Sequence, residues 1–147
     1  MDSFNAPGSI ARAVAKSEIE GLFHRYAVLA TEAPSVEKMS TLFREDAVYR
    51  LPNGNAVAPA QLLQVLRGGS PAFIRHHITS IDIEFVSPSE ARTQAFFFSI
   101  TDMSSFDHWG LWKDIVIKGG DGKWLIADRT IVVQGQDPKG WYQKTYG

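Results

Sequence analysis

The second half of the chain alternates with a period of two, and this pattern restricts the fold more than any other feature of the sequence. Successive side chains of a β-strand point to opposite faces of a sheet, so this period predicts strands. We predict four of them, over residues 74–86, 91–101, 109–117 and 123–133. The first and last connections between them are short and rich in Ser, Pro and Gly, which favours antiparallel neighbours.

Several of these strands carry apolar side chains on both faces. Phe96, Phe97 and Phe98 are consecutive, whereas a sheet with one solvated face alternates more cleanly. We therefore expect one face to pack on helices and the other to be covered as well, by a second subunit in a homodimer formed through the sheet.

The first half of the chain has helical periodicity. Apolar residues recur every three or four positions up to Ala30, which predicts a helix that begins near Ile10 or Ser17. Pro34 ends this helix, because the residue before a proline is pushed out of the α region.

Two further helices are predicted before the strands begin. Ser35 is a suitable N-cap for a short second helix. A short strand over 47–51 follows, and Pro59 fits the first position of a third helix, whose apolar face consists of Leu62, Leu63 and Leu66. Three N-terminal helices packed on a curved, mainly antiparallel sheet make the fold class α+β.

The chain divides into three parts. Residues 1–16 read as an arm that could join the first helix, 17–134 as one domain, and 135–147 as an aromatic tail. We expect the tail residues Trp141, Tyr142 and Tyr146 to cover the mouth of a cavity or a partner, because exposed aromatic residues on a free tail are unusual.

Composition excludes several classes of function. The net charge of −1, with 15 basic and 16 acidic residues, argues against a nucleic-acid binder. The chain has no cysteine, which excludes disulfides, thiolate catalysis and Cys-ligated zinc and suits the cytoplasm. No apolar run reaches the length of a membrane span or of a signal peptide's core. The aromatic content of 12% indicates a well-filled core or an aromatic-lined cavity.

The longest predicted strand changes phase. Its apolar residues occupy even positions up to Ile78 and odd positions from Ile81 onward. A β-bulge at 79–80 would add one residue and restore a single apolar face. On this interpretation His76 lies on the apolar face and His77 points the other way.

Four stretches of the sequence resemble a known family. They are Leu22–Ala27, Leu42–Tyr49, Arg75–Ile78 and Asp121–Arg129. Their order and spacing between Ser17 and Val133 are similar to those of the SnoaL-like branch of the nuclear transport factor 2-like superfamily. The resemblance implies a cone-shaped domain that encloses a pocket. The family includes scytalone dehydratase, hexachlorocyclohexane dehydrochlorinase, ketosteroid isomerase-like enzymes, polyketide cyclases and members without known activity, so the fold does not name the reaction.

The resemblance also implies catalytic positions. In the dehydratase and the dehydrochlorinase, a His on the long strand acts as a base and an Asp on the first helix orients it. His76 matches that His, and Tyr49 matches a second pocket Tyr of the dehydratase. Thr31 stands where the family has the Asp, Ala30 replaces a neighbouring Tyr, and Glu32 would face about 100° away on a helix.

Three residues are candidates for catalysis. His76 is the candidate base, since its ordinary pKa lies near neutrality. Tyr49 is the candidate donor to a developing oxyanion. Asp102 closes the second predicted strand and is the candidate replacement for the orienting carboxylate. The alternatives are a core histidine, a half-buried tyrosine and a solvated aspartate at a strand end.

Other residues are candidates for contact with a substrate: Tyr26, Phe97, His108, Trp109 and Trp112. A metal site formed by His76, His108 and Asp102 is conceivable, but no tight ligand spacing supports it. We therefore expect neither a metal nor a cofactor.

Two functions fit these features. One is a cofactor-independent lyase or isomerase that acts on a small apolar oxygenated molecule with His76 as base. The other is a non-catalytic binding or dimerisation module of the same fold. An open pocket on which His76 and Tyr49 converge would favour catalysis, and a pocket filled by Tyr26, Phe97 and Trp112 would disfavour it.

Overall fold

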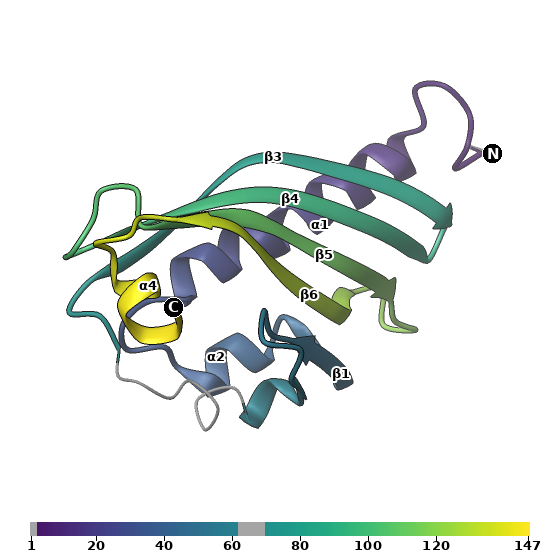
Figure 1. Ribbon diagram of the computed structural model, residues 1–147. Helices are drawn as coiled ribbons and strands as arrows, with labels where there is room; N and C mark the ends of the chain where they lie inside the picture. Colours follow the sequence, from purple (N-terminus) through teal and green to yellow (C-terminus); the bar gives the residue numbers. More distant parts are fainter. Residues whose placement is uncertain (1–2, 62–69) are drawn as a thin grey trace.

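The computed structural model describes residues 3–61 and 70–147. A six-stranded sheet has the order β2-β1-β6-β5-β4-β3, in which β1 and β6 are parallel and the other neighbours antiparallel. The strands are β1 Phe43–Arg50, β2 Ala56–Val57, β3 Ile74–Ser87, β4 Glu90–Thr101, β5 His108–Lys118 and β6 Trp124–Gln136. Figure 1 shows the four long strands curving over helix α1. The α+β class and the curved, mainly antiparallel sheet are confirmed.

Helix α1 (Ile10–Leu29) provides the apolar surface that the sheet covers. It begins at the earlier of the two predicted positions, where the Ser9 side chain accepts a hydrogen bond from Arg12 N at 3.2 Å. Its buried residues lie three or four positions apart, as the periodicity predicted: Ala15, Ile19, Leu22, Phe23 and Tyr26. Helix α2 (Val36–Ser40) follows the predicted N-cap Ser35.

Two elements differ from the prediction. A 3₁₀ turn, η1, spans Pro59–Gln61, and the predicted helical residues Leu62, Leu63 and Leu66 lie outside the described part of the chain. The tail folds into a short helix, α4 (Trp141–Tyr146), where no helix was predicted. Figure 1 shows α4 at the end of the molecule away from the N-terminal arm.

The predicted β-bulge is present in β3. Pairing with β4 shifts from Ile78↔Phe97 to Ser80↔Phe96, which leaves Thr79 as the extra residue. His76 lines the cavity on the inner face as predicted, while the ring of His77 stacks at 4.9 Å on Phe98. The bulge therefore sets which of the two adjacent histidines faces inward.

A buried ion pair links β5 to β6 beneath the cavity. Arg129 donates from Nε to Asp114 at 2.9 Å and from Nη2 at 2.6 Å, and both side chains are buried. The guanidinium carbon lies 4.1 Å from the ring centre of Tyr26 and 4.7 Å from that of Trp112. Such a pair fixes the geometry of its surroundings, because removal of either partner leaves an uncompensated buried charge.

The outer face of the sheet, which points away from α1, carries exposed apolar side chains that include Phe96 and Ile115. The exposed ring of Phe106, in the loop between β4 and β5, stacks on Phe98 of β4 at 5.0 Å. Within residues 3–61 and 70–147, no helix has the length and apolar character needed to cross a bilayer.

Candidate active site

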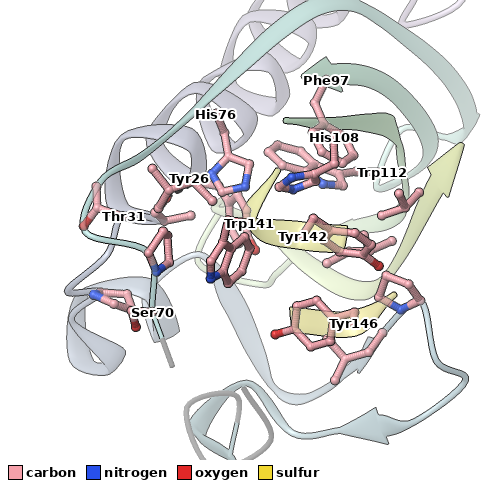
Figure 2. Close-up of a pocket in the computed structure, with 18 of the residues that line it drawn as sticks. Tyr26, Thr31, Ser70, His76, Phe97, His108, Trp112, Trp141, Tyr142 and Tyr146 are labelled. Carbon is pink, nitrogen blue, oxygen red and sulfur yellow. Dashed lines mark hydrogen bonds between the residues drawn. The ribbon is translucent and has the colours of Figure 1, made fainter. Parts of the chain in front are cut away.

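A cavity of about 570 Å³ opens between α1, the sheet and α4. Its volume lies within the usual range for small-molecule sites. Figure 2 shows side chains from α1, β3, β4, β5 and α4 around it. The predicted residues Tyr26, Tyr49, His76, Phe97, His108 and Trp112 all line the cavity without filling it. This is the open arrangement that favours catalysis over a filled core.

The two ring nitrogens of His76 have different environments. Nδ1 lies 3.0 Å from the carbonyl oxygen of Ala30, which can only accept, so Nδ1 carries the hydrogen. No hydrogen bond within the described residues involves Nε2, which keeps its lone pair. Burial, together with repulsion from His108, lowers the pKa of His76 to about 4. The imidazole is therefore neutral at pH 7, the form that accepts a proton.

Tyr26 and Tyr49 form a hydroxyl pair at the cavity wall. Their hydroxyl groups are hydrogen-bonded to each other. Burial raises the pKa of both groups, so both stay protonated. One hydroxyl hydrogen is used within the pair, and the other remains available to an acceptor. The pair is thus a hydrogen-bond donor suited to a developing oxyanion.

Among the described residues no carboxylate is hydrogen-bonded to His76, and a backbone carbonyl occupies the position of the orienting group. Ala30 and Thr31 line the cavity, and the Ala30 carbonyl orients the ring. Glu32 is engaged elsewhere: it bonds Arg75 Nη1 at 2.7 Å, and this hydrogen bond helps hold the pKa of Glu32 at about 2. A neutral carbonyl stabilises an imidazolium less than a carboxylate does, in keeping with the low pKa of His76.

Asp102 does not orient His76, and that prediction is wrong. Across the β3–β4 ladder His76 faces Ser99, whereas Asp102 is exposed and accepts a hydrogen bond from Phe73 N at 3.3 Å. The bulge and the chain direction at the end of β4 carry Asp102 away from the cavity. It contributes to the turn before β3 instead.

Asp107, which the sequence did not single out, is the buried carboxylate of this region. Its Oδ1 lies 2.8 Å from Nδ1 of His108, and Nε2 of His108 lies 3.2 Å from Ser99 Oγ. The order Ser–His–Asp resembles a hydrolase triad, but Ser99 is fully buried and is not part of the cavity lining. Both nitrogens of His108 are occupied, so His76 is the cavity histidine with an open nitrogen.

Trp109 lies outside the cavity, which corrects the prediction of a substrate contact. Its ring contacts Phe106, with centres 5.2 Å apart, and packs directly over Gly135, where a Cβ would collide with it. The tail aromatics Trp141, Tyr142 and Tyr146 line the cavity instead. In Figure 2 they project from α4 toward the same space as His76 and His108.

The conceivable metal site is not formed. Asp102 points away from His76 and His108, and the described residues contain no cluster of three His, Asp or Glu side chains that could hold a metal ion.

Comparisons with known proteins identify the family of this chain. A family model described as a SnoaL-like domain matches residues 11–130. A putative scytalone dehydratase from Novosphingobium aromaticivorans is similar in structure, with a TM-score of 0.72 and 20% identity over 86% of this chain and 89% of that one. A hexachlorocyclohexane dehydrochlorinase, LinA-type3, from Novosphingobium barchaimii has a TM-score of 0.74 and 11% identity over 87% and 92% of the two chains.

A protein of unknown function from Nostoc punctiforme, with a cystatin-like fold, has a TM-score of 0.67 and 23% identity over 88% of this chain and 96% of that one. A search of curated protein sequences finds no match. At these identities the solved structures establish the fold, and the family model spans most of the chain. The chain belongs to the SnoaL-like family.

Proposed function

We propose that this protein is a cofactor-independent lyase or isomerase for a small apolar oxygenated molecule, with His76 as general base. The observation that carries the proposal is the open Nε2 of a neutral His76, which faces a cavity of about 570 Å³. A general base must present a free lone pair in a site that holds the reacting carbon nearby. The open Nε2 and the adjoining cavity support this role for His76.

The proposed step is removal of a proton from a carbon next to a carbonyl. The C–H bond breaks, the proton moves to Nε2 of His76, and the electron pair forms a carbon–carbon double bond as charge moves to the carbonyl oxygen. The Tyr26–Tyr49 pair donates its remaining hydrogen to that oxygen. In a substrate with a second carbon–carbon double bond conjugated to the enolate, return of the proton to the far carbon of that system completes an isomerisation.

Elimination uses the same groups. A leaving group on the neighbouring carbon departs with its bonding electrons after the proton is removed, and cyclisation would use the enolate carbon to attack a second carbonyl. The names of two structural neighbours, dehydratase and dehydrochlorinase, describe eliminations, which supports this branch of the proposal.

The test is proton exchange at carbon. 1-Tetralone, an enolisable ketone, is incubated with the protein in D₂O, and deuterium uptake beside the carbonyl is followed by NMR. We expect uptake above the spontaneous rate and a loss of about 10²-fold or more in His76→Ala. His77→Ala, on the adjacent and outward-facing residue, is the matched control and should keep the rate. Equal rates of deuterium uptake with the wild type and with His76→Ala would contradict the assignment of His76 as the base.

A non-catalytic binding module is the second candidate function. The replacement of the orienting carboxylate by the Ala30 carbonyl favours it, because a histidine with a pKa of about 4 is a weak base. Binding of 1-tetralone without any exchange in the wild type would support this function.

We also propose a homodimer, formed through the outer face of the sheet, in the cytoplasm. The exposed rings of Phe96 and Phe106 support such an interface, since a soluble chain gains by covering apolar surface. The cysteine-free sequence suits a reducing compartment.

A further inference from the structure

The short helix α4 supplies one wall of the cavity with three aromatic side chains. Trp141, Tyr142 and Tyr146 all line the cavity, and the ring centres of Tyr142 and Tyr146 lie 5.0 Å apart. Rings from the sheet line the cavity as well: those of Phe97 and Trp112 are stacked at 4.9 Å, and the His108 ring lies between Phe97 and Tyr142. The cavity lining therefore contains aromatic rings from both α4 and the sheet.

We propose that α4 forms a binding subsite for a planar aromatic ring of the ligand, and that Asp107 is the positioning residue that holds this subsite in place. The inference rests on the proposed function for the identity of the pocket. The proposal adds that the pocket selects planar rings. It also gives a role to the Asp107 carboxylate, which takes no part in the proposed proton transfer.

Asp107 joins α4 to the pocket through one buried carboxylate. Its oxygens accept hydrogen bonds from the backbone N–H groups of Trp141 at 2.6 Å and Tyr142 at 3.0 Å. They also accept from the Thr101 hydroxyl at 2.9 Å and from His108 Nδ1 at 2.8 Å. Four donors satisfy a carboxylate that is fully buried. Removal of its charge would therefore release several contacts at once.

The chain entering α4 is fitted closely to this carboxylate. A Cβ at Gly140 would collide with Asp107 Oδ2, so a glycine is needed for the approach. Asp137 accepts a hydrogen bond from Ser104 Oγ at 2.6 Å, and its own N–H donates to the Asp107 carbonyl at 2.7 Å. A helix of six residues does not persist on its own, so these contacts are what fix α4 in place.

The ring geometry favours a flat ligand. Tyr142 stacks on His108, with centres 4.7 Å apart and planes 30° apart, and Trp141 lies 6.1 Å from the same ring. Stacking and edge-to-face contacts require an aromatic partner and add to the burial of apolar area. A saturated ring of similar size fills the cavity but makes neither contact. We therefore expect selection by planarity of about tenfold in affinity.

The experiment compares 1-tetralone with 1-decalone, which has two saturated rings and a ketone at the same position. Calorimetric titration of the wild type should give a dissociation constant about tenfold lower for 1-tetralone. Tyr142→Leu should reduce this preference to about twofold or less, while Phe106→Leu, an exposed ring outside the cavity, should retain it. Asp107→Asn keeps the shape but loses charge and acceptors, and it should lower the preference without changing a residue that touches the ligand.

Several outcomes overturn the proposal. Equal binding of the two ketones by the wild type, or binding of neither, does so. A full preference retained in both Tyr142→Leu and Trp141→Leu also does so, and these two variants carry the test if Asp107→Asn does not fold. Failure of the proton-transfer proposal is distinguishable, because His76→Ala would then leave exchange unchanged while the planar preference still depends on Tyr142.

Discussion

His76 differs from an exposed histidine because each ring nitrogen has one defined task. The Ala30 carbonyl fixes the hydrogen on Nδ1, and Nε2 is left open to the cavity. Burial lowers the pKa of the ring to about 4, which keeps the base in its reactive form over the whole physiological range. The lowered pKa also makes His76 a weak base. Such a base suits substrates in which a neighbouring carbonyl makes the C–H proton more acidic.

The same lowered pKa makes stability depend on pH. The pKa of His76 is about 4 in the folded protein and about 6.5 when exposed, so the unfolded chain binds the proton first as the pH falls. This group therefore reduces the free energy of unfolding as the pH drops from about 6.5 to about 4, by roughly 3 kcal/mol at most. Urea unfolding at pH 7 and at about pH 4.5 should show a smaller decrease in His76→Gln than in the wild type. Equal decreases would contradict the lowered pKa.

Sequence reasoning predicted some pocket residues and confused others. Tyr26 and His76 were predictable because a periodic helix and a phased strand fix which face each side chain occupies, whereas Tyr49 was predicted from the family resemblance. Asp102 and Asp107 lie in one loop, and spacing cannot tell which of them turns inward. The path of the loop and the approach of the tail decide it, and both depend on tertiary contacts.

At the scale of elements, the bulge was predictable and α4 was not. When the alternation of apolar residues shifts by one position within a strand, a β-bulge restores a single apolar face. A six-residue helix, in contrast, is stabilised by contacts with distant parts of the chain, here with Asp107. The first strand also begins earlier than predicted, at Phe43, because its parallel pairing with β6 starts there.

The close approach of β5 and β6 depends on Gly110. A Cβ at this position would collide with the backbone carbonyl of Val132, which cannot move aside without disturbing the ladder. We expect Gly110→Ala to lower the free energy of unfolding by about 2 kcal/mol or more. Gly21→Ala, on the exposed face of α1 where a Cβ meets nothing within 4 Å, should raise it by about 0.5–1 kcal/mol. Equal effects in denaturant unfolding would contradict this account.

The Asp114–Arg129 pair holds the same two strands together beneath the cavity. Asp114→Ala leaves a buried guanidinium without its partner and should cost about 3–5 kcal/mol in denaturant unfolding. Asp46→Ala removes a surface pair with Arg44 and should leave the unfolding midpoint nearly unchanged. If both variants unfold alike, the buried pair does not stabilise the fold.

At the scale of the whole molecule, the sheet separates two surfaces of different character. The inner face and α4 enclose the cavity, while the outer face leaves Phe96 44% exposed and the loop between β4 and β5 leaves Phe106 50% exposed. The fold class was predictable because the spacing of apolar residues along the chain predicts the order of helices and strands. The reaction was not, because several chemistries use this scaffold.

The proposed dimer can be tested at the outer face. Sedimentation of the wild type at micromolar concentration should give a dimer, and Phe96→Glu should give a monomer because it places a charge in the interface. Val28→Glu, on an exposed position of α1, is the control and should remain dimeric. A monomeric wild type would show that the outer face is not the interface.

The most direct test of the central claim is the pH dependence of deuterium uptake by 1-tetralone, measured as kcat/KM from about pH 3.5 to about pH 8. Because His76 must be neutral to act, the rate should be level above about pH 5 and fall about tenfold per pH unit below its pKa of about 4. His76→Ala should lose both the rate and this limb. A limb near pH 6.5, or the same profile in His76→Ala, would contradict the assignment of His76 as the buried, neutral base.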